Sequence, residues 1–164
     1  MEIGEITWPK LQALAAVQDR EAPKAVVVAL SSILGDVADG ALSWSLMSTT
    51  ETTTTWTCWI VTEHSVGHVR IEYTAAIYDQ SAEAQRELTP SAWSAWVRPL
   101  ADIVEFRYGA FYAAPGKSTV FEPAVPLTLI FANGDQCKIP GPIPLDQRGA
   151  ADNLFTRIRA GVKF

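Results

Sequence analysis

Apolar and polar residues alternate on both sides of the segment 64–67, a pattern typical of an antiparallel hairpin. A loop of two or four residues there sets Trp56, Cys58 and Ile60 opposite Ala75, Tyr73 and Ile71. The other face then carries Thr57, Trp59, Val61 and Glu63 opposite Thr74, Glu72, Arg70 and His68. Slipping the register by one residue would set Cys58 against Thr74. The pattern predicts a half-buried hairpin with one apolar face and one largely polar face.

Two helical stripes precede this hairpin. Thr7, Trp8 and Pro9 are typical of a helix start, and the first helix is expected to end before Pro23. The second stripe consists of Val26, Leu30, Ile33, Leu34 and Val37, and it closes at Asp39-Gly40. The β-branched run 26–28 leaves a strand open as an alternative. Ile3 and Ile6 are compatible with a short edge strand or a tail.

From residue 41 the period of the pattern changes from helical to alternating. Leu42, Trp44 and Leu46 face one way and Ser43 and Ser45 the other, which predicts the first strand of a sheet. The threonine-rich tract 49–55 then forms the turn and first rungs leading to the Trp56 strand.

The segment after the central hairpin predicts short helices. Residues 79–88 are polar and helix-favouring, and Thr89-Pro90 resembles a second helix start. Trp93, Trp96 and Val97 follow at helical spacing, which predicts a short helix that Pro99 ends. Residues 103–108 alternate again and predict another strand.

The last part of the chain predicts a hairpin and a closing helix. Pro115-Gly116-Lys117-Ser118 reads as a turn. A bulged three-residue loop, Ala132-Asn133-Gly134, pairs Leu129 with Cys137 and Leu127 with Ile139, whereas a two-residue loop would pair Leu129 with Lys138. Asp146 then caps a helix whose buried stripe is Ala151, Leu154, Phe155, Ile158 and Val162.

The order of elements predicts an α+β fold in one domain, because 164 residues without a long biased tract fit a single core. We expect an N-terminal helical segment (1–40), an antiparallel β-rich body (41–140) and a C-terminal helix (146–162). The strands are expected to curl into a partly open barrel of about six or seven strands, capped by the last helix.

The body and final helix, roughly 41–162, resemble a bacterial pleckstrin-homology-like domain. The resemblance rests on the hairpin 56–73, on the segment 97–104, and on residues 127–139 leading into the last helix. Lipid-binding members of that family place basic residues around the first hairpin, and residues 44–62 contain none. The phosphoinositide binding of the family is therefore not implied here. The order also resembles a Bet v 1-like or START-like helix-grip fold, whose closing helix is usually longer.

Charge argues against nucleic acid and membrane surfaces as partners. The formal net charge is −5, and residues 25–69 contain no Lys or Arg. That stretch therefore offers no basic residues to bind a phosphate backbone or an anionic lipid. The first ten residues do not read as a signal peptide, and the longest apolar run, 25–34, is too short to span a membrane. The expected location is cytoplasmic.

The sequence offers no complete catalytic or metal-binding constellation, so we predict no enzyme, no cofactor and no metal. His64 and His68 lack a further ligand nearby, and Cys58 shares its predicted face with apolar side chains that make a thiol inert. Cys58 and Cys137 read as small buried residues, with a disulfide between them left open. Carboxylate pairs such as Glu63 with Glu72 and Asp102 with Glu105 read as surface charge.

Aromatic residues supply the candidate functional surface. Trp59 falls on the outer face of the hairpin, where it is either exposed beside Val61 and Arg70 or covered by the N-terminal helices or the 93–97 segment. An exposed aromatic group with an arginine is typical of a binding hot spot. We therefore predict a non-enzymatic interaction module that binds a protein or self-associates, with Trp59, Val61, Arg70, Trp93 and Trp96 as its surface. The alternative is a carrier of a small apolar molecule, held between the sheet and the C-terminal helix.

Overall fold

The computed structural model describes residues 7–35, 39–109, 126–141, 143 and 145–162. Four α-helices lie within these ranges: α1 (Thr7–Ala15), α2 (Lys24–Leu34), α3 (Gln80–Ala84) and α4 (Arg148–Gly161). The strands are β1 (Leu42–Thr49), β2 (Thr54–Val61), β3 (Ser65–Tyr73), β4 (Pro90–Pro99), β5 (Ile103–Tyr108), β6 (Leu127–Phe131) and β7 (Gln136–Ile139). Two short 3-10 helices, η1 (Leu100–Asp102) and η2 (Leu145–Gln147), precede β5 and α4.

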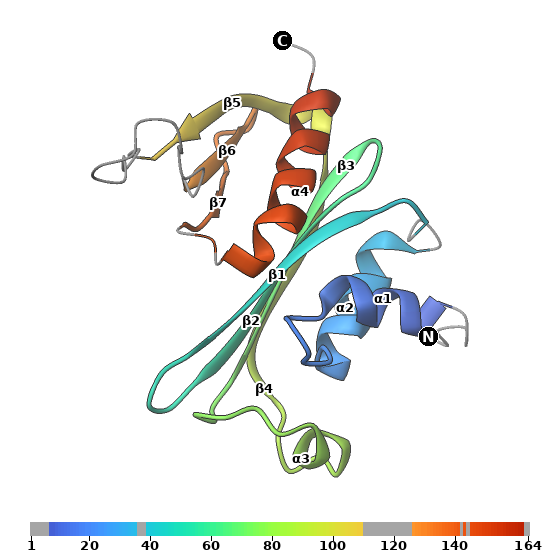
Figure 1. The fold of residues 1–164 in the computed structure, drawn as a ribbon, viewed down its shortest axis with the longest axis vertical. Coiled ribbons are helices and arrows are strands. Elements are labelled where there is room, and N and C mark those ends of the chain that lie inside the picture. Colours follow the sequence, from blue (N-terminus) through green and yellow to red (C-terminus); the bar gives the residue numbers. More distant parts are fainter. Residues whose placement is uncertain (1–6, 36–38, 110–125, 142, 144, 163–164) are drawn as a thin grey trace.

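The strands form two antiparallel sheets, which makes the fold α+β as expected. One sheet has the order β1-β2-β3-β4 and the other the order β5-β6-β7. Within the described ranges the two sheets do not join into a closed barrel. Figure 1 shows the three-stranded sheet and α4 on one side of the long twisted sheet, and α1 and α2 on the other.

The central hairpin has the predicted faces but a different register. Cys58 lies opposite Val69 rather than Tyr73, and Ile60 lies opposite Gly67 rather than Ile71. The chain turns earlier than 64–67 because the Thr62 hydroxyl accepts hydrogen bonds from the backbone N–H groups of His64 and Ser65. The resulting shift is an even number of residues, so every side chain keeps its predicted face.

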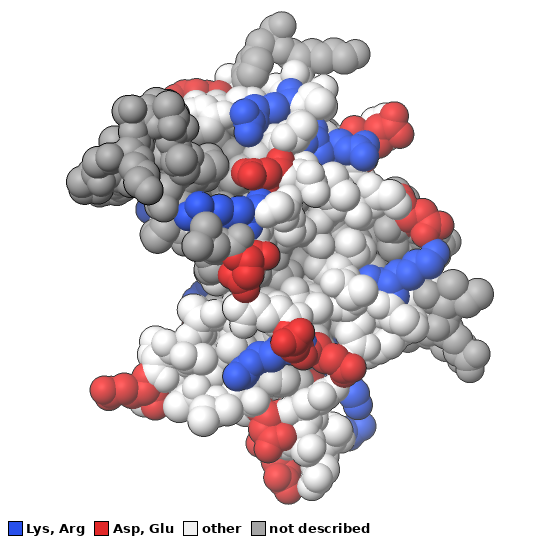
Figure 2. All heavy atoms as spheres, in the orientation of Figure 1, with Lys and Arg blue, Asp and Glu red and all other residues white. Residues whose placement is uncertain are grey.

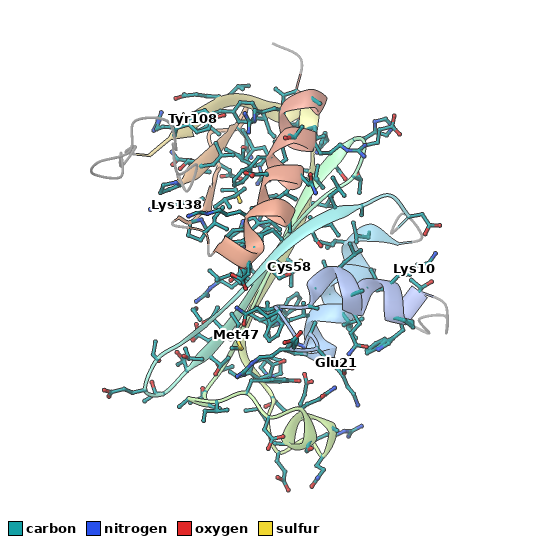
Figure 3. All side chains as sticks on the ribbon, in the orientation of Figure 1. Lys10, Glu21, Met47, Cys58, Tyr108 and Lys138 are labelled. Atoms are coloured by element: carbon teal, nitrogen blue, oxygen red, sulfur yellow. The ribbon has the colours of Figure 1, made fainter. Side chains whose placement is uncertain are left out.

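Both faces of the central hairpin, β2 and β3, pack against other elements, and the prediction of a half-buried hairpin is therefore wrong. One face packs against α1 and α2 through a cluster that includes Trp56, Cys58 and Ile71. The opposite face packs against α4 and the second sheet through a cluster that includes Trp59 and Val61. Figure 3 shows these two layers of side chains on the two sides of the sheet. The residues described contain no helix long and apolar enough to cross a membrane.

The segment 90–99 is a strand, β4, and the prediction of a short helix there is wrong. Pairing with β3 supplies its backbone hydrogen bonds and sets Trp96 opposite His68. These tertiary interactions outweigh the weak helical spacing of the two tryptophans. Trp93 and Trp96 consequently point to opposite faces of the sheet, whereas a helix would have placed them on one face.

The ends of the chain follow the sequence pattern in part. The first two helices and the strand from Leu42 are present, but α2 ends at Leu34 and not at the predicted Asp39-Gly40, because Gly35 follows with a positive φ that breaks the helix. The last hairpin has the predicted bulged loop, with Leu129 opposite Cys137 and a positive φ at Gly134. The predicted stripe of α4 is buried against the sheets. The prediction that Asp146 caps this helix is wrong, because Gln147 is the N-cap and the Asp146 carboxylate accepts a hydrogen bond from Gln18 instead. The predictions for Ile3, Ile6, Val37 and the turn 115–118 lie outside the described residues.

A row of four aromatic rings crosses the four-stranded sheet. Trp44, Trp59, His68 and Trp96 occupy directly opposed positions on β1, β2, β3 and β4. Trp44 and Trp59 stack with ring centroids 4.8 Å apart, and Trp96 meets Phe131 of β6 edge to face at 5.7 Å. The row therefore links the four-stranded sheet to the three-stranded sheet.

Candidate functional site

The structure separates the residues predicted to form one binding surface. Trp59 is 2% exposed and Val61 is fully buried. They are covered by α4 and the second sheet rather than by the N-terminal helices. The exposed Trp59 patch, one of two alternatives left open by the sequence, is therefore absent from the described fold.

The other three predicted residues lie in different environments. Arg70 is exposed and pairs with Glu72 at 2.7 Å on the same strand. Trp96 is partly buried against His68 and Phe131. Trp93 is 72% exposed. Trp93 is thus the predicted aromatic residue that remains available to a partner.

Trp93 lies on the open edge of the four-stranded sheet. The Leu100 N–H donates to the His64 carbonyl at 2.8 Å, and Pro99 has no N–H to donate. Because successive strand residues direct their backbone groups to opposite edges, Ser94 and Trp96 point toward β3. Trp93, Ala95 and Val97 then direct their N–H and C=O groups away from the sheet, where the described part of the chain places no further strand.

An apolar groove of about 350 Å³ runs beside this edge, between α2 and β4. Val28, Ala29 and Ile33 line it from α2, and Trp93 and Ala95 line it from β4. Val28 is itself 44% exposed. An exposed tryptophan, a groove and unpaired backbone groups therefore meet along one edge.

The edge lacks the charges that usually protect such strands from pairing. No charged residue occurs from Pro90 to Val97. Arg98, the first charge, pairs with Asp135 and lies over the rings of Trp96 and Phe131. The Arg98 guanidinium, with a hydrogen bond from Asn133, lowers the pKa of the Asp135 carboxyl. Lysines or other charges on an edge normally prevent edge-to-edge association.

Sequence reasoning found Trp93 but missed the groove and the edge. The groove residue Val28 lies outside the predicted stripe of α2. An apolar residue off the core stripe indicates a second apolar face on a helix, and this was the available signal. No comparable signal marks the edge, because strand order depends on the whole fold.

Apart from the β4 edge, a polar cluster centred on Glu83 holds α3 against α2. The Glu83 carboxylate accepts hydrogen bonds from the hydroxyls of Tyr73 at 2.8 Å and Tyr78 at 2.6 Å. It also accepts from the backbone N–H groups of Lys24 at 2.9 Å and Ala25 at 3.3 Å. Burial, followed by these bonds to Glu83, raises the pKa of both tyrosines. Glu83 therefore caps the N-terminus of α2 from another element.

Replacing Glu83 with glutamine is expected to lower the free energy of unfolding by about 1–3 kcal/mol, because an amide NH₂ group then faces donors in place of an acceptor. Urea denaturation measures the change. Glu87→Gln is the matched control, since Glu87 is exposed and the change should cost less than about 0.5 kcal/mol. Equal effects of the two substitutions would contradict the capping role of Glu83.

The two cysteines are free and buried in different core clusters: Cys58 lies on β2 of the four-stranded sheet, facing α1 and α2, and Cys137 lies on β7 of the three-stranded sheet, on the other side of the four-stranded sheet. Figure 3 shows Cys58 in the middle of the sheet, away from Lys138, which neighbours Cys137 on β7. Burial raises the pKa of the Cys58 thiol to about 12 and that of Cys137 to about 11. Cys58 and Cys137 therefore form no disulfide with each other, which settles the alternative left open by the sequence.

The histidines and carboxylates do not assemble into a metal site within the described ranges. His64 projects from the hairpin turn into solvent, whereas His68 lies between the rings of Trp59 and Trp96. Glu72 pairs with Arg70, and Glu105 pairs with Arg107 at 3.0 Å.

Comparison of the chain with models of protein families, with curated proteins and with solved structures gives no match. The edge and groove of β4 must therefore be interpreted from their own chemistry.

Proposed function

We propose that this chain is a non-enzymatic interaction module that binds a protein through the open edge of β4 and the adjoining groove. The observation that carries the proposal is Trp93, a large aromatic side chain that is 72% exposed beside an apolar groove. Tryptophan is enriched in binding hot spots, and an unpaired edge strand is suited to adding a strand from a partner.

The distribution of charge supports a protein as the partner. Figure 2 shows Lys and Arg interspersed with Asp and Glu on one face of the molecule, among wide uncharged areas. The chain as a whole is acidic, with a net charge of −5. Nucleic acids and anionic lipids require clustered positive charge, so we do not propose them as partners. A cytoplasmic location, expected from the sequence, belongs to this proposal.

The seven described strands followed by α4 support the resemblance to a pleckstrin-homology-like domain, with α1 and α2 added to one face. A relation to that family, or to a helix-grip fold, remains a proposal. Neither would identify the partner, because such folds carry many functions.

Substituting Trp93 with serine is expected to abolish capture of a protein partner while leaving stability nearly unchanged. Trp93 is mostly exposed, so the free energy of unfolding should change by less than about 1 kcal/mol. Loss of a central aromatic group, in contrast, typically weakens binding at least tenfold. The measurement compares affinity capture by the wild type and the variant from cells that produce the protein, with thermal melting recorded in parallel.

Ile77→Ser is the matched control because Ile77 is 76% exposed and is not among the residues lining the groove. It removes an exposed apolar side chain without touching the edge. Equal loss of capture in both variants would mean that general surface hydrophobicity causes binding. Retention of every captured protein by Trp93→Ser would contradict the proposal.

A carrier of a small apolar molecule is the second candidate. The space between the four-stranded sheet and α4, where the sequence placed a cavity, contains the packed side chains of a core cluster. The groove between α2 and β4 is the observation that now favours a carrier, since about 350 Å³ lies in the range of small-ligand sites. Native mass spectrometry separates the candidates: a carrier purifies with extra small mass that an apolar dye displaces, and an interaction module does not.

A further inference from the structure

We propose that the occupant of the β4 edge is a second copy of this chain, paired antiparallel to β4 about a two-fold axis at Ser94. This inference rests on the proposed function and names the partner. It would join two four-stranded sheets into one continuous sheet, and each copy would contribute the same surface, as a two-fold interface requires.

The backbone of β4 permits this pairing. Ser94 directs its N–H and C=O groups toward β3, while Trp93 and Ala95 direct theirs outward. In this register Ser94 lies opposite Ser94 of the second copy. Trp93 of the first copy then forms a hydrogen-bonded pair with Ala95 of the second copy, and Ala95 of the first copy forms the symmetric pair with Trp93 of the second copy. The Ser94 pair itself is a non-hydrogen-bonded pair, in which the two side chains are closest.

The side chains are complementary in size about the same axis. The segment 91–97 reads Ser-Ala-Trp-Ser-Ala-Trp-Val, so this register sets each tryptophan against an alanine. Trp93 faces Ala95 of the second copy on the groove side, and Trp96 faces Ala92 of the second copy on the other side. Ala95 lines the apolar groove, which brings Trp93 of one copy to the groove of the other.

Charge permits a second copy at this edge despite the acidity of the chain. Two copies with net charge −5 repel one another over most of their surfaces. The absence of any charge from Pro90 to Val97 means that the paired segments bring no like charges together. Arg98, just beyond, is already neutralised by Asp135.

The area available suits a reversible dimer. Paired strands and two tryptophans would bury on the order of 1,000 Å² in total, near the lower limit for a specific interface. We therefore expect an equilibrium that depends on concentration, with the mass in sedimentation equilibrium rising from 17.9 kDa toward twice that value.

Cysteine cross-linking tests both the partner and the register. Ser94→Cys is expected to give a covalent dimer for most of the chain under mild oxidation, because the two sulfur atoms meet at the axis. Val97→Cys is the matched control. It is exposed on the same strand, but the two copies of residue 97 would lie roughly 20 Å apart. The native cysteines are buried and do not compete.

A covalent dimer from Ser94→Cys but not from Val97→Cys, together with a concentration-dependent mass of the wild type, is the expected result. A wild-type mass of 17.9 kDa at all concentrations, or equal cross-linking of both variants, would overturn the inference. If Trp93→Ser then still loses capture of a different protein, the proposed function stands and only the second copy fails. If it loses no partner of any kind, both fail.

Discussion

Replacing Trp59 with alanine is expected to lower the free energy of unfolding by about 3–5 kcal/mol, the usual cost of removing a buried tryptophan. Trp59 is 2% exposed, and its ring stacks on Trp44 at a centroid distance of 4.8 Å. Its Nε1–H finds no oxygen or nitrogen acceptor among the described residues and lies by the weakly accepting thiol of Cys137. Packing, rather than hydrogen bonding, is therefore what the substitution removes.

Urea denaturation at neutral pH measures this loss. Val104→Ala provides the control, because Val104 is 53% exposed on β5 and the change should cost less than about 0.5 kcal/mol. A loss below about 1 kcal/mol for Trp59→Ala, similar to the control, would show that Trp59 is not a core residue. Association through β4 would then need to be re-examined, because Trp59 would again be a candidate surface residue.

Acidification is expected to destabilise the protein by about 2–3 kcal/mol between pH 6.5 and pH 4 through His68 alone. Burial between Trp59 and Trp96, and secondarily the charge of Arg70, lowers the pKa of the His68 imidazole to about 4. An unfolded chain binds this proton near pH 6.5 while the folded chain does not. The folded state therefore keeps its full free energy of unfolding above about pH 6.5, where His68 is neutral in both states, and loses free energy of unfolding as the pH falls toward 4.

His68→Phe isolates this effect because phenylalanine preserves a ring in the aromatic row but cannot bind a proton. We expect the difference in unfolding free energy between pH 7 and pH 4.5 to be about 2 kcal/mol smaller in the variant than in the wild type. Carboxylates such as Asp135 contribute equally to both proteins and cancel in the comparison. Identical pH dependence of the two proteins would contradict a buried, neutral His68.

Local patterns predicted the elements whose partners are close in sequence. The bulged loop at Gly134 and the stripe of α4 follow directly from turn chemistry and helical spacing. The faces of the central hairpin were predicted despite the wrong register, because an even shift does not exchange faces. The Thr62 hydroxyl, which accepts hydrogen bonds from two backbone N–H groups of the turn, leaves no trace in the alternation of apolar and polar residues.

These patterns could not predict which helices and strands cover each face of the hairpin. The outer face of the hairpin carries Trp59 and Val61 together with Arg70, and such a mixed face does not show whether another layer covers it. Burial of Trp59 and Val61 depends on α4 and the three-stranded sheet, whose residues lie more than forty positions away in the sequence. The segment 90–99 presents the same difficulty, because pairing with β3 determines its conformation.

The candidate site was predicted only in part for the same reason. The sequence identified Trp93 and Trp96 as one surface, and the strand conformation of β4 divides them between two faces. Trp96 joins the aromatic row in the core, and Trp93 is left at the edge. The functional character of Trp93 depends on strand order and on α2, which local periodicity does not encode.

Site-specific photo-crosslinking tests the β4 edge most directly. A photoreactive amino acid is introduced at Ser94, or at Ile77 as an exposed position that is not among the groove-lining residues, in cells that produce the protein. We predict protein adducts from position 94 that are absent from position 77, with mass spectrometry identifying a second copy of this chain as the partner. No protein adduct at position 94, or the same adducts at both positions, would contradict a binding edge at β4.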